Sequence, residues 1–328
     1  MSTINKDELR AGRELNRPDF PVLWDRYGIL GVLVILVALM SVIAPNFVSF
    51  NNGLNVARAV SINAILAAGM TLVILTRGID LSVGSAVALT GVSSVLLWTA
   101  GAPAIAAVLG GIVVGALTGL IDGSLVAFLG LPSFIITLGA LTYIRGLSYS
   151  LTNAQPLIAS DLGFRGLGNG AIAGIPTPVV IMLAVYAVLW FVLERTTFGR
   201  HVYAIGGNPE AARLAGVNVK WTLLRVYLIM GACAGLAGVI FAARVESGQP
   251  KAGEGYELDA IAAVVLGGTS LFGGRGRITG TLIGALIIGV LSNGLVLMDV
   301  PFFFQLVVKG AVIILAVAID GLKNLKRT

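Results

Sequence analysis

The sequence EGYELDAIAAVVLGGTSLFGGRGRITGTLIGA, residues 254–285, carries more information about the fold than any other stretch of this chain. It opens with an acidic cluster and continues with a short apolar run, residues 260–266. Glycines break that run, Arg275 and Arg277 follow, and a second apolar run begins. Non-helical backbone is tolerated at membrane depth only where protein or a water-filled cavity satisfies its polar groups. The stretch therefore predicts a short or broken membrane crossing, which is typical of transport proteins.

The composition sets the fold class. Hydrophobic residues make up 57% of the 328 residues and charged residues only 12%, and the mean hydropathy is +0.94. A soluble domain of this size would cover its surface with more polar groups, so we predict an all-α polytopic membrane protein. Its 43 glycines suit transmembrane helices that pack through small residues. A single cysteine, Cys233, and a single histidine, His201, exclude a disulfide framework and a multi-histidine metal site.

About ten apolar runs approach the roughly 20 residues that a spanning helix needs. The third and eighth runs adjoin polar sequences, TRGID and GGTSLFGG, so each is either a full crossing or a re-entrant segment. The predicted runs are residues 28–44, 59–76, 81–99, 103–127, 132–151, 178–193, 222–243, 259–272, 278–298 and 302–320.

The Lys and Arg residues set the orientation. With the N-terminus inside, only Arg58, Arg165, Arg244 and Lys251 fall in outer segments. An even number of crossings brings both termini to the cytoplasmic side. The predicted organisation is a cytoplasmic tail at 1–27, one transmembrane domain at 28–320 and a cytoplasmic tail at 321–328, with outer loops at 46–58 and 152–177 and a long inner loop at 194–221.

The inner loop 194–221 contains a short helix with strong end signals. Asn208 is a good N-cap, Pro209 suits the first helical position, and Glu210 complements the positive end of the helix dipole. Gly216 can end the helix in a left-handed conformation. The small and apolar surface of this helix predicts a cytoplasmic partner, with packing against the membrane or the bundle as the alternative. The residues assigned to the contact are Gly206, Gly207, Asn208, Pro209, Glu210, Arg213 and Gly216.

Polar residues inside apolar runs are candidates for a transport path, because a charged side chain there costs roughly 2.5 to 3.5 kcal/mol. Capping explains the acids near predicted helix ends, and snorkelling explains the basic residues. A neutral polyhydroxylated solute needs hydrogen-bond partners but no counter-charge. We assign the path to Asn63, Asp80, Ser82 and Asn293; the other charged candidates are Asp122, Arg145, Asp299 and Lys309.

Several classes of function are excluded. No GxxxxGK[ST] phosphate loop is present, so we expect no ATP bound or hydrolysed by this chain, and no catalytic set or cofactor motif is recognisable. The formal charge of +6 is spread over membrane borders rather than gathered into a basic stripe, which argues against nucleic acid as a partner. The absence of acids at helical spacing argues against an ion-coupled carrier.

Three blocks carry a family resemblance: NAILAAGMTLVILTRGIDLSVGSAVALTG (63–91), GRHVYAIGGNPEAARLAGVNV (199–219) and GYELDAIAAVVLGGTSLFGGRGRITGTLIGALIIGVLSNGL (255–295). They resemble the permease subunits of bacterial ABC importers for monosaccharides, with ribose permeases as the nearest group. The resemblance covers nearly the whole chain and departs mainly in the N-terminal tail and at residues 161–174.

The resemblance implies an inner-membrane permease that pairs with a second permease copy, a cytoplasmic ATPase that uses ATP, and a periplasmic sugar-binding protein. By the same analogy, residues 208–216 form the coupling helix seated on the ATPase. The charge bias places Glu254, Glu257 and Asp259 outside, where they meet the binding protein. The motifs do not identify the sugar. The alternatives are a branched-chain amino-acid ABC permease and an ion-coupled secondary transporter.

Overall fold

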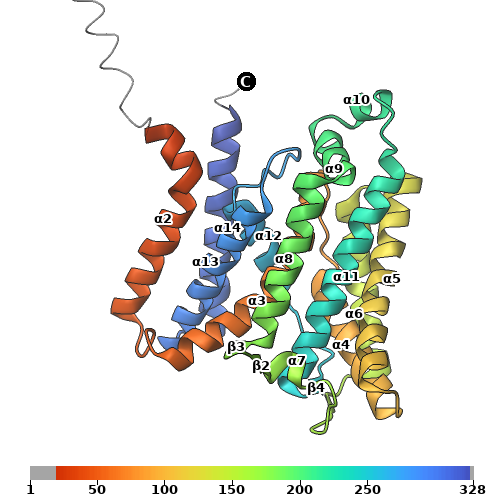
Figure 1. Ribbon diagram of the computed structural model, residues 1–328, viewed down its shortest axis with the longest axis vertical. Helices are drawn as coiled ribbons and strands as arrows, with labels where there is room; N and C mark the ends of the chain where they lie inside the picture. Colours follow the sequence, from red (N-terminus) through yellow and green to blue (C-terminus); the bar gives the residue numbers. More distant parts are fainter. Residues whose placement is uncertain (1–19, 326–328) are drawn as a thin grey trace, which may run out of the picture.

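The computed structural model describes residues 20–325 of the chain, most of them in helices (Figure 1). The long helices are α2 (Phe20–Ile43), α3 (Phe50–Leu75), α4 (Val83–Thr99), α5 (Ala104–Leu129), α6 (Ser133–Thr152), α8 (Thr177–Arg195), α11 (Val219–Val245), α13 (Ile278–Leu297) and α14 (Phe302–Leu325). The shorter elements are α7 (Gly166–Asn169), α9 (Thr197–Gly207), α10 (Pro209–Leu214), α12 (Tyr256–Leu266), β1 (Leu157–Ile158), β2 (Ala171–Ile172), β3 (Ile175–Pro176) and β4 (Ser247–Gly248).

A helix occupies each of the ten predicted apolar runs. Six of the described helices, α3, α5, α6, α8, α11 and α13, are long and apolar enough to cross a membrane. Shorter apolar helices cover Gly28–Ile43, Val83–Thr99 and Phe302–Leu315. The structure therefore supports a multi-pass helical membrane protein.

Two predicted loops turn out to be largely helical. Ser49 caps α3, accepting a hydrogen bond from the Asn52 backbone N–H, so α3 begins at Phe50 and the predicted outer loop 46–58 is short. The predicted inner loop 194–221 contains α9 as well as α10. Thr196 caps α9 through the Gly199 N–H. The starts of α3 and α9 each have one hydroxyl side chain as their cap. A single capping residue is a weaker sequence signal for a helix than a long apolar run.

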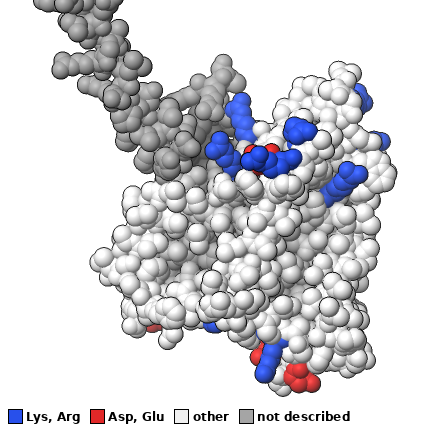
Figure 2. Space-filling model, in the orientation of Figure 1, with Lys and Arg blue, Asp and Glu red and all other residues white. Residues whose placement is uncertain are grey.

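On the face that Figure 2 shows, the charged residues lie at two opposite ends, with a broad uncharged surface between them. The start of α2, the end of α14 and helix α10 lie at the same end of the molecule (Figure 1). This arrangement fits a belt of lipid between two aqueous faces. The tail residues Lys6, Arg10, Arg13 and Arg17, which the orientation prediction used, lie outside the described residues.

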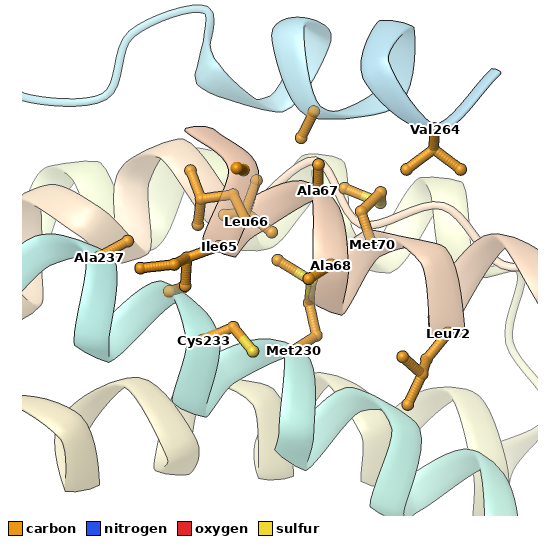
Figure 3. Close-up of a cluster of buried hydrophobic side chains, with 14 of the residues drawn as sticks. Ile65, Leu66, Ala67, Ala68, Met70, Leu72, Met230, Cys233, Ala237 and Val264 are labelled. Atoms are coloured by element: carbon orange, nitrogen blue, oxygen red, sulfur yellow. The ribbon is translucent and has the colours of Figure 1, made fainter. Parts of the chain in front are cut away.

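Helices α3 and α11 form the centre of the bundle. In the 18-residue apolar windows of these helices, 83% and 72% of residues are buried, against 28% in α5 and 22% in α6. Met70 of α3 packs with Met230 and Cys233 of α11, and Val264 of α12 covers the same cluster (Figure 3). The central helices are therefore apolar all round, as expected of helices enclosed by protein.

Three glycine ladders bring helix backbones into contact. Their glycines lie four residues apart, at Gly111, Gly115 and Gly119 of α5, Gly231 and Gly235 of α11, and Gly280 and Gly284 of α13. A Cβ on Gly115 would meet the Gly231 carbonyl and the Gly235 backbone, and a Cβ on Gly119 would meet the Tyr227 carbonyl. A Cβ on Gly284 would likewise overlap the Ala263 carbonyl of α12. These contacts confirm that the ladders serve helix packing.

Two short strand pairs close the end of the molecule opposite α10 (Figure 1). Strand β1 pairs antiparallel with β4, and β2 with β3. The predicted outer loop 152–177 is therefore a folded segment, and it is tied to residues 247–248 at the end of α11.

Candidate functional site

Helix α12 covers the first part of the apolar run that the sequence predicts to be a short or broken crossing. It has 11 residues and ends at Leu266, so it is roughly 16 Å long, about half the thickness of a bilayer core. The predicted run 259–272 therefore stops partway, and residues 249–255 enter the molecule without helical structure. Gly253 and Gly255 adopt positive φ angles of 72° and 82° there, which glycine allows without strain.

Arg145 supports this non-helical segment. One of its terminal guanidinium nitrogens donates hydrogen bonds to the carbonyls of Pro250 at 2.8 Å and Ala252 at 2.7 Å. A carbonyl without a partner would be costly at this depth. Arg145 therefore has a specific role in the interior, and the snorkelling expected from the sequence is wrong for this side chain.

A second polar cluster joins three helices at the start of α12. Lys309 of α14 forms an ion pair with Asp259 of α12, with Nζ 2.9 Å from Oδ2. Asn63 of α3 lies near the same carboxylate oxygen, with Nδ2 at 3.4 Å. The Asn63 Oδ1 atom is buried and has no hydrogen-bond partner in the described structure. The cluster thus contains an unused acceptor beside a buried ion pair.

This geometry divides the three acids assigned to docking. Glu254 is exposed and Glu257 is half-buried. Asp259 is 6% exposed and engaged by Lys309, so its assignment to an outer docking surface is corrected. The sequence grouped Asp259 with Glu254 because the two acids are close along the chain. The ion pair between Asp259 of α12 and Lys309 of α14 shows that the start of α12 faces the interior.

The predicted path residues Asp80 and Ser82 lie together at the start of α4. The Ser82 backbone N–H and hydroxyl lie 2.9 and 2.6 Å from Asp80 Oδ1. The same hydroxyl lies 3.1 Å from Asp122 Oδ2 on α5. All three side chains are buried. Because a hydroxyl has one proton, Ser82 can donate to only one of the two carboxyl groups at a time.

Asn293, the fourth predicted path residue, is separate from the others. Its amide exchanges two hydrogen bonds with Asn52 of α3, at 2.9 and 3.0 Å. Asn52 also donates to the Phe47 carbonyl. The two amides satisfy each other, which leaves this pair less capacity for a solute than the Asn63 cluster.

Helix α10 forms as predicted. The Asn208 side chain accepts hydrogen bonds from the N–H groups of Glu210 and Ala211, both at 3.0 Å. Gly216 ends the helix region with a φ angle of 85°. Arg213 and Glu210 form a surface ion pair at 2.7 Å, with side chains 69% and 72% exposed. Leu214 is 85% exposed, so α10 presents an apolar side chain to its surroundings.

Gly206 and Gly207, which the sequence analysis assigns to the partner contact, pack against other segments of the chain. They are the last residues of α9 and take part in a tight junction. A Cβ on Gly206 would overlap the Leu75 carbonyl and the Gly274 backbone. A cavity of about 200 Å³ lies at this junction. Its lining residues are Arg77, Gly206, Gly207, Ser270, Phe272, Gly273, Gly274 and Arg275.

Arg77 and Lys309 are the residues at these sites whose roles the sequence analysis missed. The sequence analysis assigned no specific role to Arg77, and it placed Lys309 among the charged path candidates with snorkelling as its explanation. One signal was available for Lys309. Burying a lone lysine or a lone aspartate in an apolar run costs more free energy than burying the two as an ion pair.

Comparisons with known proteins identify the family. The family described as "Branched-chain amino acid transport system / permease component" matches residues 52–317. The chain is 49% identical over 297 residues to the ribose import permease protein RbsC of Escherichia coli (strain K12), covering 89% of this chain and 92% of that protein. It is 46% identical over 313 residues to RbsC of Bacillus subtilis (strain 168), covering 95% and 97%.

The D-allose transport system permease protein AlsC of Escherichia coli (strain K12) is 42% identical over 324 residues, covering 98% of each chain. No solved structure matches the chain. These relatives confirm the predicted resemblance to sugar permeases. The family match includes α10, Arg145 and the cluster around Asp259. The chain belongs to this family of ABC importer permease components.

Proposed function

We propose that this chain is the membrane-spanning subunit of an ATP-driven, binding-protein-dependent importer for a monosaccharide, ribose or a similar sugar. The observation that carries the proposal is the near full-length similarity to permeases named for ribose and allose. A branched-chain amino-acid substrate, the alternative suggested by the family description, has less support.

The assembly that follows contains two permease copies, an ATPase at the α10 end and a sugar-binding protein at the opposite end. Both termini are then cytoplasmic, in the inner membrane, because the described ends of α2 and α14 share the end that carries α10. Exposed Leu214 on α10 supports an ATPase contact. Exposed Glu254 and half-buried Glu257 remain the residues proposed to contact the binding protein.

The proposed path runs by the Asn63 cluster. The Lys309 side chain is 23% exposed inside an apolar helix. A lysine facing lipid there would be costly, so its exposed part faces a hydrated path or the second permease copy. A sugar hydroxyl can donate to the orphan Asn63 Oδ1 and accept from the Lys309 ammonium.

Transport proceeds by alternating access. ATP-driven closure of the two ATPase subunits moves the α9–α10 region, and the helices around the path open to one side at a time. This chain supplies the path and the coupling surface, and the ATPase subunit supplies the hydrolysis.

Reconstitution tests the proposal. The chain is placed in proteoliposomes with its ATPase and binding protein, and uptake of labelled ribose, allose and leucine is measured with and without ATP. We expect ATP-dependent uptake of a monosaccharide. Uptake of leucine alone, or sugar accumulation by this chain alone on a sodium or proton gradient, would contradict the proposal.

Replacing Arg213 or Glu210 by Ala tests the coupling surface. We expect reduced co-purification of the ATPase with unchanged membrane insertion, because both side chains project from α10. Arg200→Ala is the matched control, since Arg200 is an exposed basic residue on neighbouring α9. Equal co-purification of all variants would remove α10 from the interface.

A further inference from the structure

We propose that Arg77 is the positioning residue that transmits movement of the coupling helix α10 to the short helix α12 and to α3. The inference rests on the proposed function, because it assigns a mechanical role within the transport cycle. It concerns a residue outside both α10 and the polar clusters of the path.

Arg77 reaches across the chain to the end of α9. Its Nε donates to the Gly206 carbonyl at 2.7 Å, and a terminal guanidinium nitrogen donates to the Gly207 carbonyl. These carbonyls are among the last of α9, where the helix dipole is negative and a cation is favoured. The next residue is Asn208, the N-cap of α10. One guanidinium therefore holds the joint between α9 and α10.

The backbone conformation of Arg77 is unusual and directs attention to this contact. Arg77 has a φ angle of 66°, in the left-handed region that arginine rarely adopts. The preceding turn ends α3, with the Arg77 N–H donating to the Ile74 carbonyl at 2.9 Å. The side chain is therefore carried on the end of the most buried helix, and a strained conformation there is retained only where its surroundings enforce it.

The loop after α12 joins the same point. The Gly274 N–H donates to the Leu75 carbonyl at 2.9 Å, at the end of α3. The Tyr203 hydroxyl of α9 donates to the Gly276 carbonyl at 3.0 Å. A Cβ on Gly273 would be 2.5 Å from the Arg77 Cγ, so the loop lies directly on the arginine stem. Three segments far apart in sequence thus meet around one side chain.

The loop is short and internally bonded, so it can pass a displacement on to α12. The Thr269 N–H donates to the Val264 carbonyl of α12 at 3.1 Å, and the Ser270 N–H donates to the Arg275 carbonyl at 2.9 Å. Helix α12 then runs without a break back to Asp259, which Lys309 holds. A shift of α10 is therefore carried through Arg77 to both residues that face each other in the path cluster, Asn63 on α3 and Asp259 on α12.

Arginine is suited to this role because its guanidinium is planar and presents several donors in a fixed geometry, whereas lysine is a point charge on a flexible stem. The two variants Arg77→Met and Arg77→Lys therefore separate geometry from charge. Methionine keeps most of the apolar stem that touches Gly273 but removes every donor.

The test uses the complete transporter in proteoliposomes, with sugar uptake and ATP hydrolysis measured on the same vesicles. For Arg77→Met we expect the sugar transported per ATP to fall at least about tenfold, because the variant loses both charge-assisted hydrogen bonds to the end of α9 and even one is worth about that factor. ATPase co-purification and hydrolysis stimulated by the loaded binding protein stay near wild type. Arg77→Lys gives an intermediate ratio.

Two further variants keep the test decisive. Tyr203→Phe removes only the hydroxyl that bonds Gly276, so we expect a smaller loss in the same ratio even if Arg77→Met assembles poorly. Arg275→Met is the matched control, because exposed Arg275 lines the same cavity without bonding the end of α9.

Three results would overturn the inference: a wild-type ratio in Arg77→Met, an equal loss in Arg275→Met, or a parallel fall in hydrolysis, uptake and melting temperature that marks a purely structural role. Failure of the wild-type complex to transport any sugar would instead contradict the proposed function, which separates the two proposals.

Discussion

Two segments enter the helical bundle without helical structure, residues 76–82 before α4 and residues 249–255 before α12. Each must satisfy backbone groups among apolar helices, and each does so differently. The first uses several neutral hydroxyls and an aspartate. The second uses one arginine from a neighbouring helix.

At the first segment the bonds are many and individually modest. The Ile79 N–H donates to the Ser133 hydroxyl at 3.2 Å. The Thr137 hydroxyl lies 3.1 Å from the Ile79 carbonyl and 2.9 Å from the Ser133 carbonyl, and it can donate to either. Asp80 closes the turn by accepting from the Ser82 N–H, an Asx-type turn. Loss of any one of these leaves the others in place.

At the second segment the support is concentrated. Arg145 bonds two carbonyls of the segment, and bonds to a charged donor are stronger than neutral ones. The second segment also touches the start of α4, because Gly84 packs against the Gly253 carbonyl. The comparison predicts that the second segment depends on a single side chain and that the first tolerates single losses.

The largest expected effect is that of Arg145→Met. It leaves the Pro250 and Ala252 carbonyls without their charged donor, so we expect the free energy of unfolding to fall by about 3 to 5 kcal/mol. Denaturant titration in mixed micelles measures it. Arg145→Lys, which keeps one donor group, should lose less. A loss below about 1 kcal/mol in Arg145→Met would show that other groups support the segment.

A smaller effect is expected where the second segment touches the start of α4. In Gly84→Ala the new methyl group overlaps the Gly253 carbonyl and the Glu257 carboxylate, and overpacking of this kind costs about 1 to 3 kcal/mol. The matched control is Gly139→Ala on α6, where a Cβ meets nothing within 4 Å. That control should be neutral or gain about 0.5 to 1 kcal/mol from helix propensity.

The melting temperatures of the two glycine variants, recorded side by side, test this contact. Equal stability of Gly84→Ala and Gly139→Ala would mean that the contact between α4 and the second segment does not constrain the fold. An added methyl group at Gly84 has no free space, because the Gly253 carbonyl and the Glu257 carboxylate are too close. A gain in stability for Gly84→Ala would therefore contradict the described packing.

The smallest effect is expected for Thr137→Val. The substitution removes one neutral hydroxyl that bonds the Ile79 carbonyl, so we expect a loss of about 1 kcal/mol. The same titration used for Arg145→Met provides the comparison. A loss as large as that of Arg145→Met would contradict the distributed support proposed for the first segment.

The features that the sequence predicted well are local or compositional. The N-cap at Asn208, the proline after it and the glycine at 216 act over a few residues, and α10 forms between them. The ten apolar runs became helices because burial in lipid or protein requires internal backbone hydrogen bonds. The predicted loops 46–58 and 194–221 were wrong in detail because hydroxyl caps extend helices beyond their apolar cores.

The features that the sequence could not supply depend on pairs of distant residues. Asp259 and Lys309 are 50 residues apart and Asn63 and Asp259 are 196 apart, yet they share one carboxylate. No pattern along the chain distinguishes Asp259, which turns inward, from exposed Glu254 beside it. The same holds for Arg77, whose partners are 129 and 130 residues away.

The sequence by itself determined that this chain is a helical membrane protein with a glycine-interrupted apolar run near residue 260 and an exposed capped helix at 209–214. Hydropathy, caps and turn residues act locally, so they can be recognised along the chain. The tertiary structure decided where the break ends, which charges pair in the interior, and that Arg77 joins three segments. Those outcomes depend on which helices pack side by side, and only the folded chain brings the residues within hydrogen-bonding distance.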